Sequence, residues 1–131
     1  MAVRILLVDD HNAVRQGIRV LLSGHPEWVI IDEARDGIEA VEKASHLKPD
    51  VIVLDVTMPR MDGLEACRQI RKNIPETEVL IVTQHESSQM MHEAIKAGAS
   101  GYVTKVNVVR DLEMAVDVVS RHGCFPAEMR N

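Results

Sequence analysis

Aromatic residues, cysteines and basic charge are all scarce in this sequence of 131 residues. Aromatics make up only 2% of the chain, so the core must be built from Val, Ile, Leu, Ala and Met. The two cysteines, Cys67 and Cys124, are too few and too irregularly placed for a disulfide framework or a zinc site, and we expect free thiols. The formal net charge of −5 argues against a broad basic surface that binds nucleic acid or anionic lipid.

Long hydrophobic runs are also missing. The N-terminal run in MAVRILLVDD is too short for a signal peptide, and no stretch approaches the ~20 apolar residues of a membrane span. With 46% hydrophobic and 27% charged residues, the chain has the composition of an ordinary globular domain. The sequence therefore predicts a single domain in the cytoplasm, without a membrane segment.

The sequence does contain a regular alternation of short apolar runs with helical patterns. Three of the runs lack polar alternation, which indicates strands that are covered on both faces. Between the runs, apolar residues recur at helical spacing, for example Val14, Ile18 and Leu22. Pro75 and Gly98 stand where two of these helices should end. The five runs that we interpret as strands are residues 3–8, 28–31, 51–54, 79–82 and 102–103.

This alternation predicts the α/β fold class. Right-handed crossovers between parallel strands put helices on both faces of a parallel sheet. Five βα units of this length suit the flavodoxin-like (βα)5 fold with strand order 2-1-3-4-5, although periodicity alone does not fix the order. We expect the domain to span residues 1–122, followed over 123–131 by a C-terminal tail or the start of a linker.

Polar residues follow the strands that would meet at the switch point of this fold. Asp9 and Asp10 follow the first predicted strand, and Asp55 follows the third. In open α/β sheets, ligands bind beyond the carboxyl ends of the strands, at the point where the strand order reverses. We therefore expect the three carboxylates to converge there, beside Thr83 and Lys105 at the ends of the fourth and fifth strands.

Three converging carboxylates repel one another unless a cation lies among them. Mg2+ meets this need, because it is typically held by one or two carboxylates together with water and phosphate. The acidic loop that begins at Asp9 argues against a nucleotide or flavin pocket, which would offer glycine-rich or hydroxyl-rich phosphate loops. In a magnesium site, Asp55 could act as a nucleophile and form an acyl phosphate, with Lys105 and Thr83 as donors to the phosphoryl oxygens. Taken singly, each of these residues has a plainer structural interpretation.

Four segments of the chain resemble the receiver domains of two-component response regulators, which have a CheY-like fold. The segments are LLVDDH, VIVLDVTMPRMDGLEA, LIVTQH and GASGYVTK, and the resemblance covers residues 3–121. It implies that Asp55 is phosphorylated by a histidine kinase in a reaction that needs Mg2+. It also implies that Asp10, Asp55 and the backbone carbonyl of Thr57 bind the ion directly, while Asp9 acts through water.

The resemblance further implies a conformational switch. Thr83 and Lys105 match the hydroxyl and the lysine of the family's phosphorylation site. In the family, the hydroxyl moves toward the phosphoryl group, and an aromatic residue that matches Tyr102 rotates inward behind it. The surface of the fourth helix, fifth strand and fifth helix is then remodelled for a partner or for a homodimer. On the sequence alone, simple packing of Tyr102 at a strand edge is an equally good interpretation.

The DDH, TQH and GYVTK variants look most like NarL-type regulators, whose receivers precede a LuxR-type helix-turn-helix domain. The tail GCFPAEMRN has no helix-turn-helix pattern after it. Contact with DNA and control of transcription would therefore belong to an output domain outside this chain. The chain is expected to be either an excised receiver or a stand-alone one.

Two positions depart from the commonest pattern of the family. Gln84 stands where many members carry Ala or Gly, and it could narrow access to the phosphoryl group. Val106 stands where many receivers have a proline after a cis bond. A non-proline cis bond costs about 2.5–4 kcal/mol, so we predict a trans bond or a rearranged loop after Lys105. His11 and His85 lie near the expected site, but Mg2+ prefers oxygen and we do not expect either as a ligand.

Two other functions stay open at this point. A magnesium phosphatase like the haloacid dehalogenases would also use Asp55 as a covalent nucleophile. Such enzymes carry a second acid two residues later, where this chain has Thr57. A pseudo-receiver that signals only by binding a protein is disfavoured by the intact set of acids, but Gln84 and Val106 keep it open.

Overall fold

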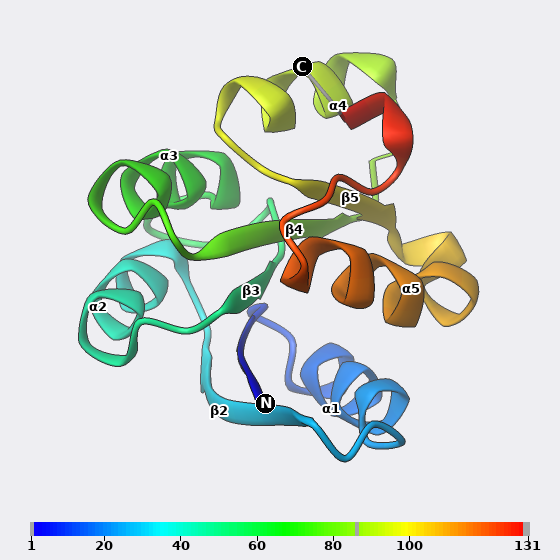
Figure 1. The fold of residues 1–131 in the computed structure, drawn as a ribbon. Helices are drawn as coiled ribbons and strands as arrows, with labels where there is room; N and C mark the ends of the chain where they lie inside the picture. The colour runs from blue at the N-terminus through cyan, green and yellow to red at the C-terminus, as the bar shows by residue number, and fades with distance from the viewer. Residues whose placement is uncertain (1, 86, 130–131) are drawn as a thin grey trace.

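Five parallel strands form a single sheet in the order β2-β1-β3-β4-β5 (Figure 1). The structure is a computed structural model, and it describes residues 2–85 and 87–129. The α/β fold class and the flavodoxin-like strand order predicted from the sequence are confirmed. The strands are β1 (Val3–Val8), β2 (Trp28–Ala34), β3 (Val51–Leu54), β4 (Glu78–Thr83) and β5 (Gly101–Thr104).

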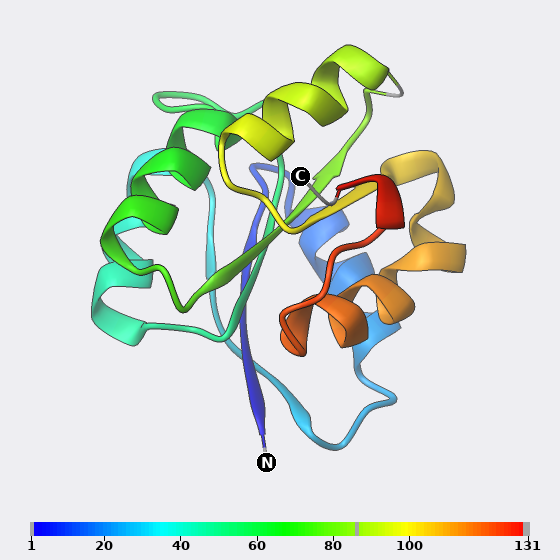
Figure 2. The same cartoon turned by 45° about the horizontal axis from the view of Figure 1, so that its top comes forward.

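Helices cover both faces of the sheet, as Figures 1 and 2 show. One face packs against α1 and α5, and the other against α2, α3 and α4. Within the described residues, no helix is long and apolar enough to cross a bilayer. The α-helices are α1 (Asn12–Leu22), α2 (Gly37–Leu47), α3 (Gly63–Asn73), α4 (Ser88–Lys96) and α5 (Val108–Ser120); two 3-10 helices are η1 (Lys105–Asn107) and η2 (Ala127–Met129).

The central strands are buried on both faces. Successive side chains of a strand point to opposite sides of the sheet. In β3, Val51 packs in the core on the α1–α5 side and Ile52 in the core on the α2–α4 side, and both are 0% exposed. Every residue of β3 and β4 is buried. This double burial explains why these strands lack polar alternation, and it leaves only the strand ends for polar side chains.

The observed strands are longer than predicted where polar residues end them. β2 continues to Ala34 instead of stopping at residue 31, because Asp32 and Glu33 stay paired with Leu6 and Leu7 of β1. β4 begins at Glu78, whose backbone N–H donates to Asp50 across a 3.0 Å hydrogen bond. The hydrophobic pattern missed these residues because backbone pairing, which is blind to side-chain polarity, fixes where a strand ends.

Helix caps fix the loops at the site edge of the sheet. Asp62 accepts a hydrogen bond from the backbone of Glu65 and so begins α3. Asp36 does the same for α2, through the backbone of Glu39. At the opposite edge of the sheet, where the chain enters β5, Gly98 follows α4 with a φ of 97°, a conformation that favours glycine at this position after a helix, as the sequence predicted.

Residues 123–129 lie against the edge strand β5. The backbone of Phe125 accepts from Tyr102 N–H at 2.8 Å and donates to Ser100 at 3.0 Å, which forms a short parallel bridge. Met129 then inserts into the core on the α2–α4 side and is only 2% exposed. The segment that we expected to be a tail or the start of a linker therefore covers a sheet edge that would otherwise present unpaired backbone groups.

Candidate functional site

The pairing of β1 with β3 brings two of the acids to the same edge of the sheet. Val8 of β1 pairs with Leu54 of β3, so the next residues, Asp9 and Asp55, leave the sheet side by side. The backbone N–H of Asp55 donates to Val8 at 2.9 Å, which continues the ladder past the end of β3. Because β2 and β3 lie on opposite sides of β1, this edge is the switch point of the sheet.

The ammonium of Lys105 lies between these two carboxylates. Its Nζ is 3.0 Å from Asp9 Oδ2 and 3.5 Å from Asp55 Oδ1. The side chains of Asp9 and Asp55 are only 3% and 5% exposed, and that of Lys105 is 16% exposed. A single ammonium thus pairs with two buried carboxylates, so the cluster has an excess of negative charge.

This shortage affects the titration of Asp55. Burial and the negative charge of Asp9 raise the pKa of the Asp55 carboxyl, and the nearby Lys105 ammonium and the backbone N–H of Val56 offset this only in part. The ionised form of Asp55 is therefore costly in the metal-free protein. A second cation close to the carboxylates would lower this cost.

Replacing Lys105 by methionine is expected to raise the pKa of Asp55 further, because the substitution removes the main group that lowers it. The titration of the Asp55 side-chain carbonyl carbon can be followed by NMR in metal-free protein. Lys72→Met, at an exposed position on α3, is the matched control and should leave the titration unchanged. An Asp55 titration curve that is the same in Lys105→Met and wild type would contradict this electrostatic account.

A cavity of about 100 Å³ opens beside Asp55. A polar cavity of this size can hold ordered water. Its lining includes the carboxylates of Asp10 and Asp55 together with Thr57, and this oxygen-rich donor set fits a hydrated hard cation. The lining residues are Asp10, His11, Asp55, Thr57, Gln84 and Lys105.

His11 lies closer to the acids than the sequence suggested. Its backbone N–H donates to Asp9 Oδ1 at 2.8 Å, and its ring Nδ1 lies 3.0 Å from Asp10 Oδ1. Asp9, Asp10 and His11 form a group whose potential ligand atoms all lie within 4.8 Å of one another, among the residues that the structure describes. Asp55 is not part of this tight group, and its carboxylate contacts Lys105 at 3.5 Å. That His11 is not a ligand stays a prediction.

Thr83 and Gln84, at the end of β4, differ in their position relative to the cavity. Thr83 is 1% exposed, and its hydroxyl accepts a 3.2 Å hydrogen bond from the backbone N–H of His85. It does not line the cavity, whereas the exposed Gln84 does. A hydrogen bond from Thr83 to a group in the cavity would therefore need a movement of this loop. That Gln84 narrows access to this cavity stays a prediction.

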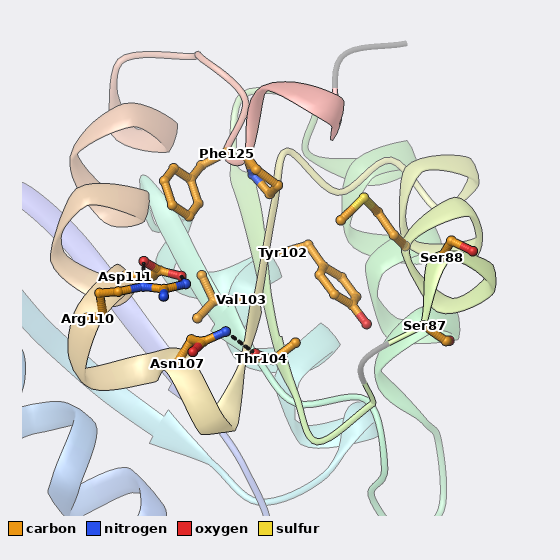
Figure 3. Close-up of a pocket in the computed structure, with 11 residues that line it drawn as sticks. Ser87, Ser88, Tyr102, Val103, Thr104, Asn107, Arg110, Asp111 and Phe125 are labelled. Atoms are coloured by element: carbon orange, nitrogen blue, oxygen red, sulfur yellow. Dashed lines mark hydrogen bonds and ion pairs between the residues drawn. The ribbon is translucent and has the colours of Figure 1, made fainter.

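Tyr102 connects β5 with the same loop. Its ring is buried among the core residues on the α2–α4 side, and its hydroxyl donates to the backbone carbonyl of His85. In Figure 3 the ring points toward the start of α4, whereas Val103 points to the other side of β5, where Phe125 lies. The pocket drawn there has a volume of about 550 Å³. Thr83 and Tyr102 thus both form hydrogen bonds with the backbone of the same residue, His85.

The loop after Lys105 differs from a proline-containing loop. Among the described residues the cis peptide bond is that between Phe125 and Pro126, so the bond between Lys105 and Val106 is trans, as predicted. The chain turns at once into η1 (Lys105–Asn107), and the Asn107 side-chain amide donates to Thr104 Oγ1 at 3.2 Å. This turn starts α5 without a proline.

The loop that carries Asp55 and Thr57 is anchored at both ends. The backbone N–H of Gly63 donates to Val56 at 2.7 Å, which packs the start of α3 directly on the Asp55–Val56 peptide. Further along, Arg60 binds Asp36, with its Nε 3.0 Å from Oδ2. The hydrogen bond from Gly63 to Val56 therefore holds this loop to the start of α3, and the pair of Arg60 with Asp36 holds it to the start of α2.

The sequence analysis missed Arg15. This residue lies on α1, is 7% exposed, and donates to the backbone carbonyl of Asp9. A signal was present, because Arg15, Ile18 and Leu22 recur at helical spacing on the buried face of α1. An arginine on a buried helix face is rarely accidental, since an unpaired buried charge is strongly destabilising.

Comparison with known proteins identifies sequence relatives. A family model described as the response regulator receiver domain matches residues 5–117. The response regulator protein VraR of Staphylococcus aureus is 39% identical over 121 residues, which are 92% of this chain and 58% of VraR. The chain thus spans less than two thirds of the length of that relative.

Solved structures are also similar. One is a two-component response regulator of the LuxR family from an Aurantimonas species, with a TM-score of 0.90 and 38% identity, covering 95% of this chain and 89% of that one. Another is the signal receiver domain of a response regulator described as NarL from Mycobacterium tuberculosis, with a TM-score of 0.86 and 31% identity. That match covers 92% of this chain and 97% of the other.

Proposed function

Because this chain belongs to the family of response regulator receiver domains, in its NarL/LuxR-type branch, we propose that Asp55 accepts a phosphoryl group from a sensor histidine kinase. The observation that carries the proposal is the buried contact of Lys105 with both Asp55 and Asp9 beside a polar cavity. The arrangement offers a carboxylate nucleophile with its own cationic donor at the edge of the sheet where ligands bind.

The proposed cofactor is Mg2+. Asp10, Asp55 and the Thr57 backbone carbonyl would hold the ion, with Asp9 acting through water. Support comes from the cavity, which is lined by Asp10, Asp55 and Thr57, and from the acidic group next to it. When bound, the ion would supply positive charge to the phosphoryl oxygens and to the carboxylates that Lys105 alone balances poorly.

The chain's own residues have distinct tasks in the transfer. An oxygen of Asp55 forms a bond to phosphorus, while the N–P bond of the donor's phosphohistidine breaks and the imidazole nitrogen keeps the electron pair. The anchored loop between Val56 and Gly63 holds Asp55 in place during attack. Lys105, 3.5 Å from Asp55 Oδ1, can donate to the transferred group, and Thr83 would join it after a loop movement.

The phosphoryl group would act as a switch signal. Movement of Thr83 would pull on the loop to which the Tyr102 hydroxyl is bonded, and would so alter the α4–β5–α5 surface. We propose that this surface controls a homodimer or an output domain outside this chain, which would make the contact with DNA. The receiver would span residues 1–122, with residues 123–129 packed against its strand β5 and its core. It would reside in the cytoplasm and would be a switch with no turnover activity of its own.

The test is incubation of the wild-type protein with acetyl phosphate and Mg2+, followed by mass spectrometry of the intact protein. We expect a single phosphoryl adduct with Mg2+ and none when EDTA removes the ion. Steady hydrolysis of p-nitrophenyl phosphate would instead favour the magnesium phosphatase. Absence of both the adduct and cation binding would favour a pseudo-receiver.

A further inference from the structure

The guanidinium of Arg15 is a buried charge that needs an explanation. Its side chain is only 8% exposed, on the face of α1 that packs toward the sheet. Removing an arginine from water is costly unless charge pairing and hydrogen bonds compensate for the lost hydration. A methionine or leucine would fill the same face without that cost, so the partners of Arg15 indicate its role.

Arg15 bonds to three partners, from three parts of the chain. Its Nε is 2.6 Å from Glu33 Oε1 near the end of β2. Its Nη1 donates to the backbone carbonyl of Asp9 at 2.5 Å, and its Nη2 donates to Asn12 Oδ1 at 3.2 Å. The planar guanidinium thus ties α1 and β2 to the point where the chain leaves β1.

The bond to Asp9 acts on the peptide that joins Asp9 to Asp10. The backbone N–H of Asp9 already donates to Ala34 at 3.1 Å, so the Arg15 bond fixes the other polar group of that residue. Asp10 itself has a side chain that is 29% exposed, and packing alone does not hold it. Its direction therefore depends on the Asp9–Asp10 peptide, which Arg15 holds, and on the contact of its carboxylate with the His11 ring at 3.0 Å.

Glu33 is the charged partner that holds the Arg15 guanidinium in place. It is held by two arginines, since Arg19 Nη2 lies 2.5 Å from Oε2 and Arg15 binds Oε1. The hydrogen bond from Arg19, and then that from Arg15, hold the pKa of Glu33 below its ordinary value against the opposing effect of burial. Glu33 therefore stays ionised at neutral pH, as a constant acceptor for Arg15.

We propose that Arg15 is a positioning residue for the acidic cavity, which sets divalent-cation affinity by holding the Asp9–Asp10 peptide through the Asp9 carbonyl. The inference rests on the proposed function only for the presence of the cation. Groups that orient the ligands of a metal, without touching the metal, commonly change its affinity by 10–100-fold when they are removed. Arg15 would act in this way through a backbone carbonyl.

Mn2+ titration followed by electron paramagnetic resonance, which reports the free ion, tests the proposal without any phosphoryl donor. We expect Arg15→Gln to weaken Mn2+ binding by roughly 10-fold or more. Arg15→Lys keeps the charge but loses the planar fork, so it should fall between Arg15→Gln and wild type. Arg19→Gln is the matched control, because Arg19 binds the same Glu33 but has no bond to the Asp9 carbonyl, and it should change affinity by less than roughly 2-fold.

A second readout separates positioning from general destabilisation. In the metal-free proteins, the backbone amide of Asp10 should shift in NMR spectra of Arg15→Gln and stay in place in Arg19→Gln. If Arg15→Gln does not fold, Arg15→Lys is compared with Arg19→Gln in the same two measurements. Equal Mn2+ affinity in wild type and the Arg15 variants, or an equal loss in Arg19→Gln, would overturn the inference. Failure of the wild type itself to bind Mn2+ would instead overturn the metal site of the proposed function.

Discussion

Replacing Asp55 by asparagine is expected to abolish the phosphoryl adduct and, at the same time, to make the folded domain more stable. The first effect follows because the amide lacks the anionic oxygen that would attack phosphorus. Asp9 lies beside Asp55 and bonds to the same Lys105, but the backbone N–H of His11 already occupies its Oδ1 at 2.8 Å. We therefore expect no replacement nucleophile at the wild-type rate.

The gain in stability follows from the raised pKa of Asp55. A carboxyl whose pKa is higher in the folded than in the unfolded chain stabilises the fold below its unfolded pKa of about 4, and this contribution is lost as the pH rises through the folded pKa. At neutral pH the buried carboxylate therefore weighs against folding. An uncharged amide does not carry the free-energy cost of a buried negative charge, and it leaves Lys105 paired with Asp9 at 3.0 Å.

Urea unfolding at several pH values, in metal-free buffer, measures the second effect. The free energy of unfolding of Asp55→Asn should exceed that of the wild type at neutral pH, and the difference should shrink as the pH falls through the folded pKa. Asp117→Asn, on the outer face of α5 with a side chain 46% exposed, is the control for losing one negative charge. It should keep the adduct and should not show the gain in stability at neutral pH. An Asp55→Asn protein that forms the adduct as the wild type does would refute Asp55 as the acceptor.

The fold was predictable from the sequence because its signals are local and repeated. Apolar runs such as VIVL at 51–54 have the length of strands buried on both faces, and Gly98 marks the end of a helix through ordinary cap chemistry. The C-terminal end of β2 was not predictable in this way. Asp32 and Glu33 belong to the strand because β1 pairs with them, and that pairing is a property of the assembled sheet.

The candidate site was predictable only to the level of strand ends. Topology brought Asp9, Asp55 and Lys105 into contact because strand order fixes which strand ends are neighbours. Side-chain directions depend on local hydrogen bonds that no spacing rule contains. The Thr83 hydroxyl faces the backbone of His85 for this reason, and it does not line the cavity.

Arg15 shows a different limit of sequence reasoning. Its place on the buried stripe of α1 can be seen in the spacing, but its partner Glu33 is 18 residues away at the end of a strand that the pattern had shortened. A charge on an apolar face indicates that some partner exists. Only the packing of α1 against β2 identifies that partner and the Asp9 carbonyl beside it.

The second large effect is expected from Gly63→Ala, at the start of α3. A Cβ at this position would lie 2.0 Å from the backbone oxygen of Asp55 and 2.8 Å from Cα of Val56. Backbone atoms cannot turn aside as a flexible side chain can, so either the start of α3 or the end of β3 must shift. Overpacking of this kind costs about 3 kcal/mol or more, which is a large part of the stability of a domain of this size.

Gly17→Ala provides the matched control for this substitution. Gly17 lies inside α1 with no other atom within 4 Å of its added Cβ, so alanine there should stabilise the domain by about 1 kcal/mol through helix propensity. Urea unfolding should thus move in opposite directions for the two variants. At subdenaturing urea, the folded fraction of Gly63→Ala should also form the phosphoryl adduct more slowly than wild type, because the shift displaces the peptide that carries Asp55. If Gly63→Ala has the same free energy of unfolding as the wild type, the start of α3 can move away without cost. The close contact of α3 with the Asp55 backbone would then not hold the nucleophile in place.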